Sequence, residues 1–359
     1  MTYETNLNFH SLFEHHTLSE SMNRVRQIHS TCYRTQLIAA QNIAHHSNLY
    51  SDRKPLNESS PSALDTLALS ETLKLLFNLT QYYPDQSPSF TPSLPHILKI
   101  LCHLDLPSPP LQPPVNYLIN ALLNLDTINE GDPHSPPSNP FFPEPNPNRT
   151  TDRLIAILDS TVRQPPHQEE DLERTTPPLI SLLRKLYSHA PPPLKPHLQT
   201  QLLPSPSERS LALGRSPTLA SHLLRLSTSA LAPTLRETIS QLLFDLSDRD
   251  ATTFVRNVGY GFASGFLMTH DFPVPDAALR GEDLGANVTT VDGREVNPVT
   301  GQRRDMEAEV EEEAMTEEEK EREAERLFVL FERLKATGVV DVQNPVARAV
   351  QEGRFEELE

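Results

Sequence analysis

A succession of leucine-rich segments, separated by Pro or Ser-Pro, most constrains what this chain can fold into. Segments of this kind suit helices, and a proline ends a helix at or before the preceding residue. No segment alternates apolar and polar residues with the period of two that marks a half-buried strand. Pairs of helical segments recur at about 40 residues, a spacing typical of armadillo and HEAT repeats. The sequence therefore predicts an all-α, armadillo/HEAT-like α-solenoid.

The expected helices can be placed along the chain. One is expected over residues 16–48, a short one over 62–69, and another that Ser70 caps. Because apolar residues surround nearly the whole circumference of the helix after Ser70, we expect it to be buried. The remaining expected helices span residues 94–104, 115–125, 151–162, 170–189, 194–203, 208–226 and 231–246.

Two stretches interrupt this series and set the predicted domain boundaries. Residues 131–149 contain seven prolines and are expected to form an exposed, disordered insertion. Residues 272–315 begin with proline-rich chain and run into a string of glutamates, which predicts an acidic flexible linker. The expected parts are an irregular or partly helical segment (1–60), the repeats with their insertion (61–271), the linker (272–315), an amphipathic helix (316–338) and a tail (339–359).

The expected C-terminal helix carries its own start and stop signals. Thr316 and Glu319 form a capping-box pattern, and Gly338 is a typical C-terminal stop. The apolar side chains fall on one stripe, opposite an acidic face. The stripe consists of Ala324, Leu327, Phe328, Phe331 and Leu334. We expect this helix to dock on the solenoid, on a partner, or on both.

The charge distribution argues against several kinds of partner. The formal net charge is −17, and residues 276–359 hold 23 acidic and 11 basic residues. Because the chain has no block of Lys and Arg, we expect neither nucleic-acid binding nor attraction to anionic membranes. No apolar run approaches the ~18 residues that span a bilayer, and the N-terminus lacks a signal-peptide pattern. We therefore expect a cytoplasmic protein, and a monomer.

The search for catalytic and metal-binding motifs finds none. Cys32 and Cys102 lack paired spacing, so neither a disulfide framework nor a zinc site is predicted. Gly259, Gly261 and Gly265 faintly resemble a dinucleotide-binding fingerprint, but no strand precedes them and the third glycine comes one residue late. Tight helix–turn–helix packing is the preferred interpretation. No enzymatic site, metal or cofactor is expected.

Three asparagines, Asn78, Asn120 and Asn124, lie inside otherwise apolar helices, where Asn is a poor helix former. Either they line a groove, where an amide can hydrogen-bond a bound peptide, or neighbouring groups of the chain satisfy them. A similar choice applies to the basic residues at 184–185 and Lys195. They form a positive spot for an acidic partner, or they are solvated surface.

Three motifs then give the chain a specific resemblance. Residues 254–267 read FVRNVGYGFASGFL, residues 296–301 read VNPVTG, and residues 315–327 read MTEEEKEREAERL. In this order they resemble motifs of the synembryn family. Residues 73–80 and 184–204 are compatible with that family more loosely.

The resemblance implies both a fold and a function. Synembryns have an armadillo/HEAT-like solenoid and bind GDP-loaded or nucleotide-free Gα subunits of heterotrimeric G proteins. Their concave surface takes the C-terminal helix of Gα, their tail helix reaches the GTPase domain, and GDP leaves. Members also act as folding chaperones for Gα. The resemblance thus implies an exchange factor and chaperone that makes or breaks no bond, located in the cytoplasm and at the cell cortex through Gα.

The site residues follow by position. Two groups are expected to contact Gα: in the groove Phe77, Asn78, Asn120 and Lys195, and in the tail helix Leu327, Phe328 and Phe331. Relatives often carry an acidic Ser/Thr cluster before the VNPVTG motif, suited to phosphorylation. Here Thr289, with Asp292 three residues on, is the corresponding candidate, and a silent surface Thr is the alternative.

One departure from the family leaves the function open. Members are usually longer, and residues 1–60 do not resemble their N-terminal repeats. If those repeats help to grip Gα, exchange activity is in doubt. A helical-repeat scaffold that binds Gα or another protein without exchange is therefore the alternative.

Overall fold

A computed structural model describes residues 38–49, 62–125, 139–163, 169–273, 290–291, 293–307 and 316–336. By its contacts the chain divides into two compact units, Met1–Glu307 and Ala308–Glu359. Among the described residues, no helix has both the length and the apolar composition that crossing a bilayer requires.

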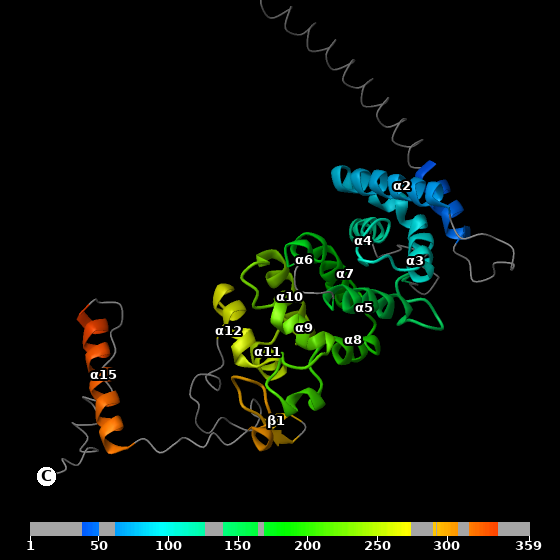
Figure 1. The fold of residues 1–359 in the computed structure, drawn as a ribbon. Helices are drawn as coiled ribbons and strands as arrows, with labels where there is room; N and C mark the ends of the chain where they lie inside the picture. Colours follow the sequence, from blue (N-terminus) through cyan, green and yellow to red (C-terminus); the bar gives the residue numbers. More distant parts are fainter. Residues whose placement is uncertain are drawn as a thin grey trace, which may run out of the picture. The chain divides into compact units, whose positions relative to one another are not determined.

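The first unit is a series of helices with short connections (Figure 1). Residues 38–49 are helical. The α-helices that follow are α2 (Ala63–Tyr82), α3 (Leu94–His103), α4 (Val115–Asn124), α5 (Arg149–Val162), α6 (Glu169–Thr175), α7 (Pro177–His189), α8 (Leu194–Leu202), α9 (Leu219–Leu226), α10 (Pro233–Leu246), α11 (Ala251–Val258) and α12 (Tyr260–Thr269). The short elements are the 3-10 helices η1 (Pro84–Ser93), η3 (Pro206–Ser210) and η4 (Arg304–Met306), and the strands β1 (Thr290–Val291) and β2 (Arg294–Glu295). In the second unit, α15 spans Glu317–Ala336.

Helices far apart in the sequence pack into two rows. In the first row α2 packs against α4, α4 against α7, and α7 against α10. In the second row α3 packs against α5, α5 against α9, and α9 against α8. Contacts of α3 with α4 and of α5 with α7 join the rows. Each helix pair buries its apolar face against the next pair, as in an α-solenoid. The prediction of an all-α helical-repeat fold is confirmed.

α2 is one continuous helix where two were expected. Ser62 is its N-cap: Ser62 Oγ accepts the Asp65 N–H at 3.2 Å, and the Ser62 N–H donates to Asp65 Oδ2 at 2.9 Å. Ser70 lies inside the helix and donates its hydroxyl to the Thr66 carbonyl oxygen at 2.8 Å. A serine before glutamate resembles a cap, but here its hydroxyl bonds to the preceding turn and the helix continues.

The prediction that this helix is buried is wrong for one of its faces. Its fully buried leucines are Leu69, Leu73 and Leu76. Four apolar side chains on the other face are between 38% and 75% exposed, and we call them the α2 stripe: Leu64, Leu67, Leu75 and Tyr82. α2 is the first described helix of its row, so α4 is its row neighbour on one side only. An exposed apolar stripe of this length is typical of an interaction surface.

Prolines divide two of the expected helices. The expected helix 170–189 is α6 followed by α7, which begins at Pro177. The expected helix 208–226 is η3, a loop that contains Pro217, and α9. Because proline lacks an N–H and disfavours a helical residue before it, it can open a helix but not continue one.

The proline-rich insertion is ordered where the structure describes it. Residues 126–138 lie outside the described part, and residues 139–148 form turns that lead into α5. Phe141 is fully buried in the core, and Phe142 packs against it. The expectation of an exposed, disordered segment is therefore wrong for residues 139–149, because an aromatic anchor offsets the polar and proline-rich composition.

The acidic linker is likewise partly folded. β1 and β2 pair antiparallel, with Thr290 opposite Glu295 and Val291 opposite Arg294. Val296 is buried and bridges to Arg303. An isolated two-stranded hairpin is marginally stable, so its order depends on packing elsewhere. Residues 274–289 and 308–315 of the expected linker lie outside the described part.

Candidate protein-binding surface

The basic residues Arg184 and Lys185 of α7 tie the helices of the first row together. Lys185 Nζ donates to the carbonyl oxygens of Leu123 and Leu125 at 2.8 and 2.5 Å, at the C-terminal end of α4. Arg184 Nε lies 2.8 Å from Asp245 Oδ2 on α10. Cations at a helix C-terminus satisfy its last carbonyls. Both charges therefore bind partners within the first unit. The sequence had suggested either a positive spot for an acidic partner or solvated surface, and neither interpretation included these internal contacts.

Three of the four expected groove residues lie on two helices that pack together. Phe77 and Asn78 belong to α2 and Asn120 to α4; Phe77 and Asn120 are half-buried, and Asn78 is exposed. Asn124 of α4 donates from Nδ2 to Gln81 Oε1 of α2 at 3.2 Å, so a neighbouring side chain satisfies it. Helical spacing places Asn78 on the same face as the α2 stripe. The stripe was not predicted from the sequence, although the helical spacing of its four apolar residues is visible there.

Lys195 lies elsewhere in the unit. Its Nζ is 5.4 Å from the centroid of the Tyr187 ring, a cation–π contact between α8 and α7. Burial, and then the Asp248 carboxylate, raise the pKa of Tyr187 to about 12. α8 packs against α9 and α10. The structure therefore does not bring Lys195 together with the α2–α4 residues.

α15 of the second unit presents apolar side chains to solvent. Leu327 and Phe328 are both exposed, as are the adjacent Val329 and Leu330. Phe331 lies within the helix, and its side chain is outside the described part. Arginine side chains border Val329 and Leu330 along the helix: Arg322, Arg326 and Arg333. The helix thus carries basic as well as acidic residues beside its apolar stripe.

Two of the three family-like motifs meet at the end of the solenoid. The N–H of Tyr260 donates to the Pro298 carbonyl oxygen at 2.8 Å, and the N–H of Gly261 donates to that of Val299 at 3.0 Å. Both N–H groups belong to the first turn of α12, where backbone N–H groups have no carbonyl partner within the helix. Residues 296–301 therefore cap α12 from a distant part of the chain.

The glycines of the first motif permit this approach. Gly259 has φ +82°, and a Cβ there would lie 3.0 Å from the Val299 carbonyl oxygen. A Cβ on Gly261 would lie 3.1 Å from the same oxygen. Gly259 joins α11 to α12, in line with the expected helix–turn–helix. The close backbone approach adds a reason that the sequence alone did not show.

Arg209 holds the same junction from inside. The side chain is 3% exposed. Its Nη1 donates to the Gly301 carbonyl oxygen at 3.0 Å, and Nη2 donates to those of Arg256 and Asn257 at 3.0 and 2.9 Å. One guanidinium thus links η3, the C-terminal end of α11 and the VNPVTG motif. The buried N–H fork suits several carbonyls at once.

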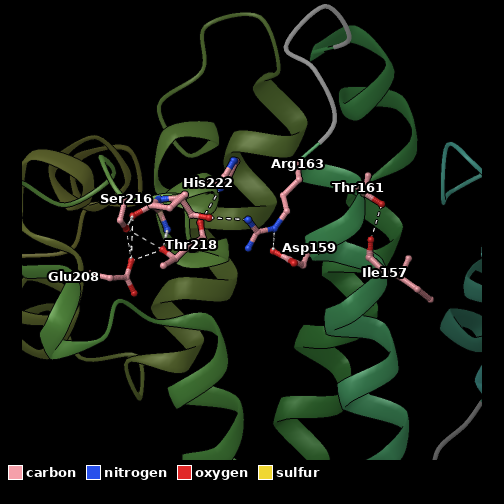
Figure 2. A network of polar contacts seen from close by, with 10 residues as sticks. Ile157, Asp159, Thr161, Arg163, Glu208, Ser216, Thr218 and His222 are labelled. Carbon is pink, nitrogen blue, oxygen red and sulfur yellow. Dashed lines mark hydrogen bonds and ion pairs between the residues drawn. The ribbon is translucent and has the colours of Figure 1, made fainter.

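A carboxylate network orders the neighbouring loop (Figure 2). Glu208 Oε2 accepts the hydroxyls of Ser216 and Ser221 at 2.8 and 3.1 Å, and also that of Thr218. Across the loop, Arg163 Nη1 donates to the Pro217 carbonyl oxygen at 2.8 Å. Burial acts to raise the pKa of Glu208, but the hydrogen bonds, from Thr218 first, outweigh it and lower the pKa below its ordinary 4.5. The Glu208 carboxylate thus ties the loop before α9 to the start of that helix.

Glu208→Gln is expected to lower the free energy of unfolding by about 1–3 kcal/mol at pH 7, since it weakens hydrogen bonds to a charged acceptor. Because the folded pKa is depressed, the wild-type stabilisation is present above pH 4.5 and is lost as the pH falls through the lowered value. Urea unfolding at pH 7 and in steps below pH 4.5 checks this. The variant should show a smaller loss on acidification, and Glu170→Gln, an exposed control on α6, should match the wild type. A variant that keeps the wild-type pH profile would contradict the assignment.

Two further expectations from the sequence concern metal binding and phosphorylation. Within the described residues, no group of three or more His, Cys, Asp or Glu side chains is placed to hold a metal ion. Thr289, the candidate phosphorylation site, lies outside the described part.

Comparison with known proteins identifies the family. Residues 12–354 match the family described as guanine nucleotide exchange factor synembryn. A synembryn-like chaperone of Schizosaccharomyces pombe is 30% identical over 189 residues, covering 50% of this chain and 35% of that protein. Chaperone Ric-8A of Bos taurus is 27% identical over 197 residues, covering 52% of this chain and 36% of that protein. These alignments span about a third of each relative. Because the family match extends over nearly the whole chain, this chain belongs to the synembryn family.

Proposed function

We propose that this chain binds Gα subunits of heterotrimeric G proteins in the cytoplasm, promotes GDP release from them and assists their folding. The observation that carries the proposal is the match of residues 12–354 to the exchange-factor family. The related proteins named as chaperones support the folding role. The activity requires no bond to be made or broken, because tighter binding to open, empty Gα than to closed, loaded Gα is sufficient.

The first-row surface is the proposed site for the C-terminal helix of Gα. The α2 stripe offers exposed apolar side chains, interrupted by the Glu71–Lys74 ion pair, and Asn78 on the same face offers an exposed amide. Phe77 of α2 and Asn120 of the adjacent α4 are half-buried. A helix that lays its apolar face on such a surface uses anchors at helical spacing, and polar groups set its register. Lys195 would contribute charge farther along the unit.

α15 is the proposed second contact with Gα. Leu327 and Phe328 are 43% and 41% exposed in the described structure, and burying them on a partner would favour association. Ordering the helix on the partner opposes part of that gain. Phe331 would extend the contact one turn farther. The two contacts together would raise the affinity by linkage within one chain.

The test is GDP release from a purified Gα subunit with and without this chain. We expect an acceleration of at least about tenfold, equivalent to ~1.4 kcal/mol in the barrier. Leu67→Glu, on the α2 stripe, and Leu327→Glu, on α15, should each remove most of it. Leu231→Glu is the matched control, since Leu231 is likewise exposed, at 70%, but lies before α10. Equal losses from all three variants would contradict the site, and absence of binding to any Gα would contradict the function.

A scaffold without exchange activity is the second candidate. It is favoured by the names of the matched relatives, which describe them as chaperones. Stable binding of Gα without faster GDP release would support this candidate against the first.

A further inference from the structure

A cavity of about 910 Å³ lies on the second row, away from the α2 stripe. It is formed by α3, the turns of residues 139–148, the start of α5 and the chain after α7. Much of its wall is apolar, including Pro95, Leu98, Pro140, Phe142 and Pro143. A cavity of this size is within the range of ligand sites, and proline and aromatic walls suit an apolar or aromatic side chain.

Two cations in this cavity form no ion pair with an acidic residue of the described part of the chain. Lys99 of α3 and Arg149 of α5 both line it, and no ion pair among the described residues engages either one. Glu144 is the carboxylate at the lining, together with the histidines His103 and His189. In a chain of net charge −17, the half-buried Lys99 and the exposed Arg149 place two positive charges beside a mainly apolar wall.

The Arg149 guanidinium is held in place by neutral groups. Its Nη2 lies 2.6 Å from His103 Nε2, and His103 Nδ1 lies 2.7 Å from the Lys99 carbonyl oxygen. The carbonyl can only accept, so Nδ1 carries the proton and Nε2 accepts from Arg149. The Cys102 thiol also contacts Arg149; burial raises the pKa of this thiol, an effect that Arg149 partly opposes. The His103 ring and the Cys102 thiol therefore orient Arg149, and no described carboxylate forms an ion pair with it.

We propose that this α3–α5 cavity binds an acidic peptide segment of a partner protein. Carboxylates of the peptide would pair with Lys99 and Arg149, and an apolar side chain between them would pack against Leu98 and Phe142. A charge-assisted pair beside an apolar contact gives both orientation and affinity. A small free anion would leave the apolar wall unused, which favours a peptide. The site is separate from the proposed Gα surface and does not depend on it.

The first experiment measures binding of a fluorescein-labelled peptide, one phenylalanine flanked by two glutamates on each side, by fluorescence anisotropy with the full chain. We expect saturable binding that weakens as salt increases. Lys99→Gln and Arg149→Gln should each raise Kd about tenfold. Arg174→Gln is the control, because Arg174 is an exposed cation on α6. The same peptide with glutamine in place of glutamate should bind more weakly than the acidic one.

The second experiment locates the peptide through Cys102, which lines the same cavity. In a Cys32→Ser background, saturating peptide should slow alkylation of Cys102 by a maleimide several-fold. Phe142→Ala should reduce both affinity and protection. Circular dichroism melting identifies any variant that fails to fold. If another variant fails to fold, the affinity measured for Lys99→Gln, a substitution at a half-buried site on α3, is the deciding result. Three results would each overturn the proposal: no saturable binding, equal binding of the glutamine peptide, or binding that leaves Cys102 unprotected.

Discussion

Arg209→Leu is expected to lower the free energy of unfolding of the first unit by about 3–5 kcal/mol, within the range for breaking a buried charged network. The substitution removes donors from the carbonyls of Gly301, Arg256 and Asn257, all in or beside a buried junction. Each buried acceptor left without its donor costs about 1–3 kcal/mol. The leucine recovers some apolar burial but cannot bridge η3, α11 and the VNPVTG motif.

Urea unfolding followed by circular dichroism measures this loss. Arg215→Leu is the matched control, since Arg215 lies in the loop that follows η3 and is exposed; its effect should stay within ~0.5 kcal/mol. Arg209→Lys should fall between, because an ammonium cannot reproduce the planar fork. Limited proteolysis should also cut residues 293–307 faster in Arg209→Leu than in the control. Similar stability for the two leucine variants would rule out a structural role for Arg209.

Gly301→Ala is expected to destabilise the first unit by about 2–4 kcal/mol, the sum of backbone strain and overpacking. Gly301 has φ +67°, a region that L side chains rarely adopt. An alanine Cβ would also collide with the Leu213 side chain, whose Cγ would lie 2.8 Å away. Leu213 is 5% exposed and packed in the core, so it cannot simply swing aside. The variant should therefore push the VNPVTG motif away from α11 and α12.

Gly293→Ala separates the two causes, because Gly293 has φ +74° but nothing within 4 Å of the added Cβ. It should cost only the backbone part, about 1 kcal/mol. A double-mutant cycle of Gly301→Ala with Leu213→Ala should show a favourable coupling, since the smaller side chain relieves the collision. Thermal and urea unfolding of all four variants provide the measurement. Equal costs for Gly293→Ala and Gly301→Ala, with no coupling, would show that the collision is relieved in another way.

Sequence reasoning succeeded where the signal is local. Leucine periodicity and proline punctuation are short-range, so they identified the helices and the solenoid class without tertiary information. They erred at three residues: Ser70 resembled a cap, and Pro177 and Pro217 were passed over within expected helices. Whether Ser70 caps a helix or lies inside one, and whether a proline ends a helix, depended on the conformation of the neighbouring turn.

The candidate surfaces could be predicted only in part. Phe77 and Asn78 were expected within a helix and lie in one, but the apolar circumference of α2 gave no indication of which face stays exposed. Arg184 and Lys185 looked like free surface charges, whereas α4 and α10 supply their partners from about 60 residues away. The buried Phe141 side chain anchors a segment whose composition had predicted disorder.

The amino-acid sequence by itself determined the helical repeats, the acidic C-terminal region and the family motifs. Only the tertiary structure decided which helix faces are covered and that two of those motifs touch. The physical reason is that helix formation depends on neighbours within a few residues, whereas burial depends on packing partners from distant parts of the chain. The carbonyls of Pro298 and Val299 cap α12 only because residues 296–301 return to it, and no local pattern encodes that contact.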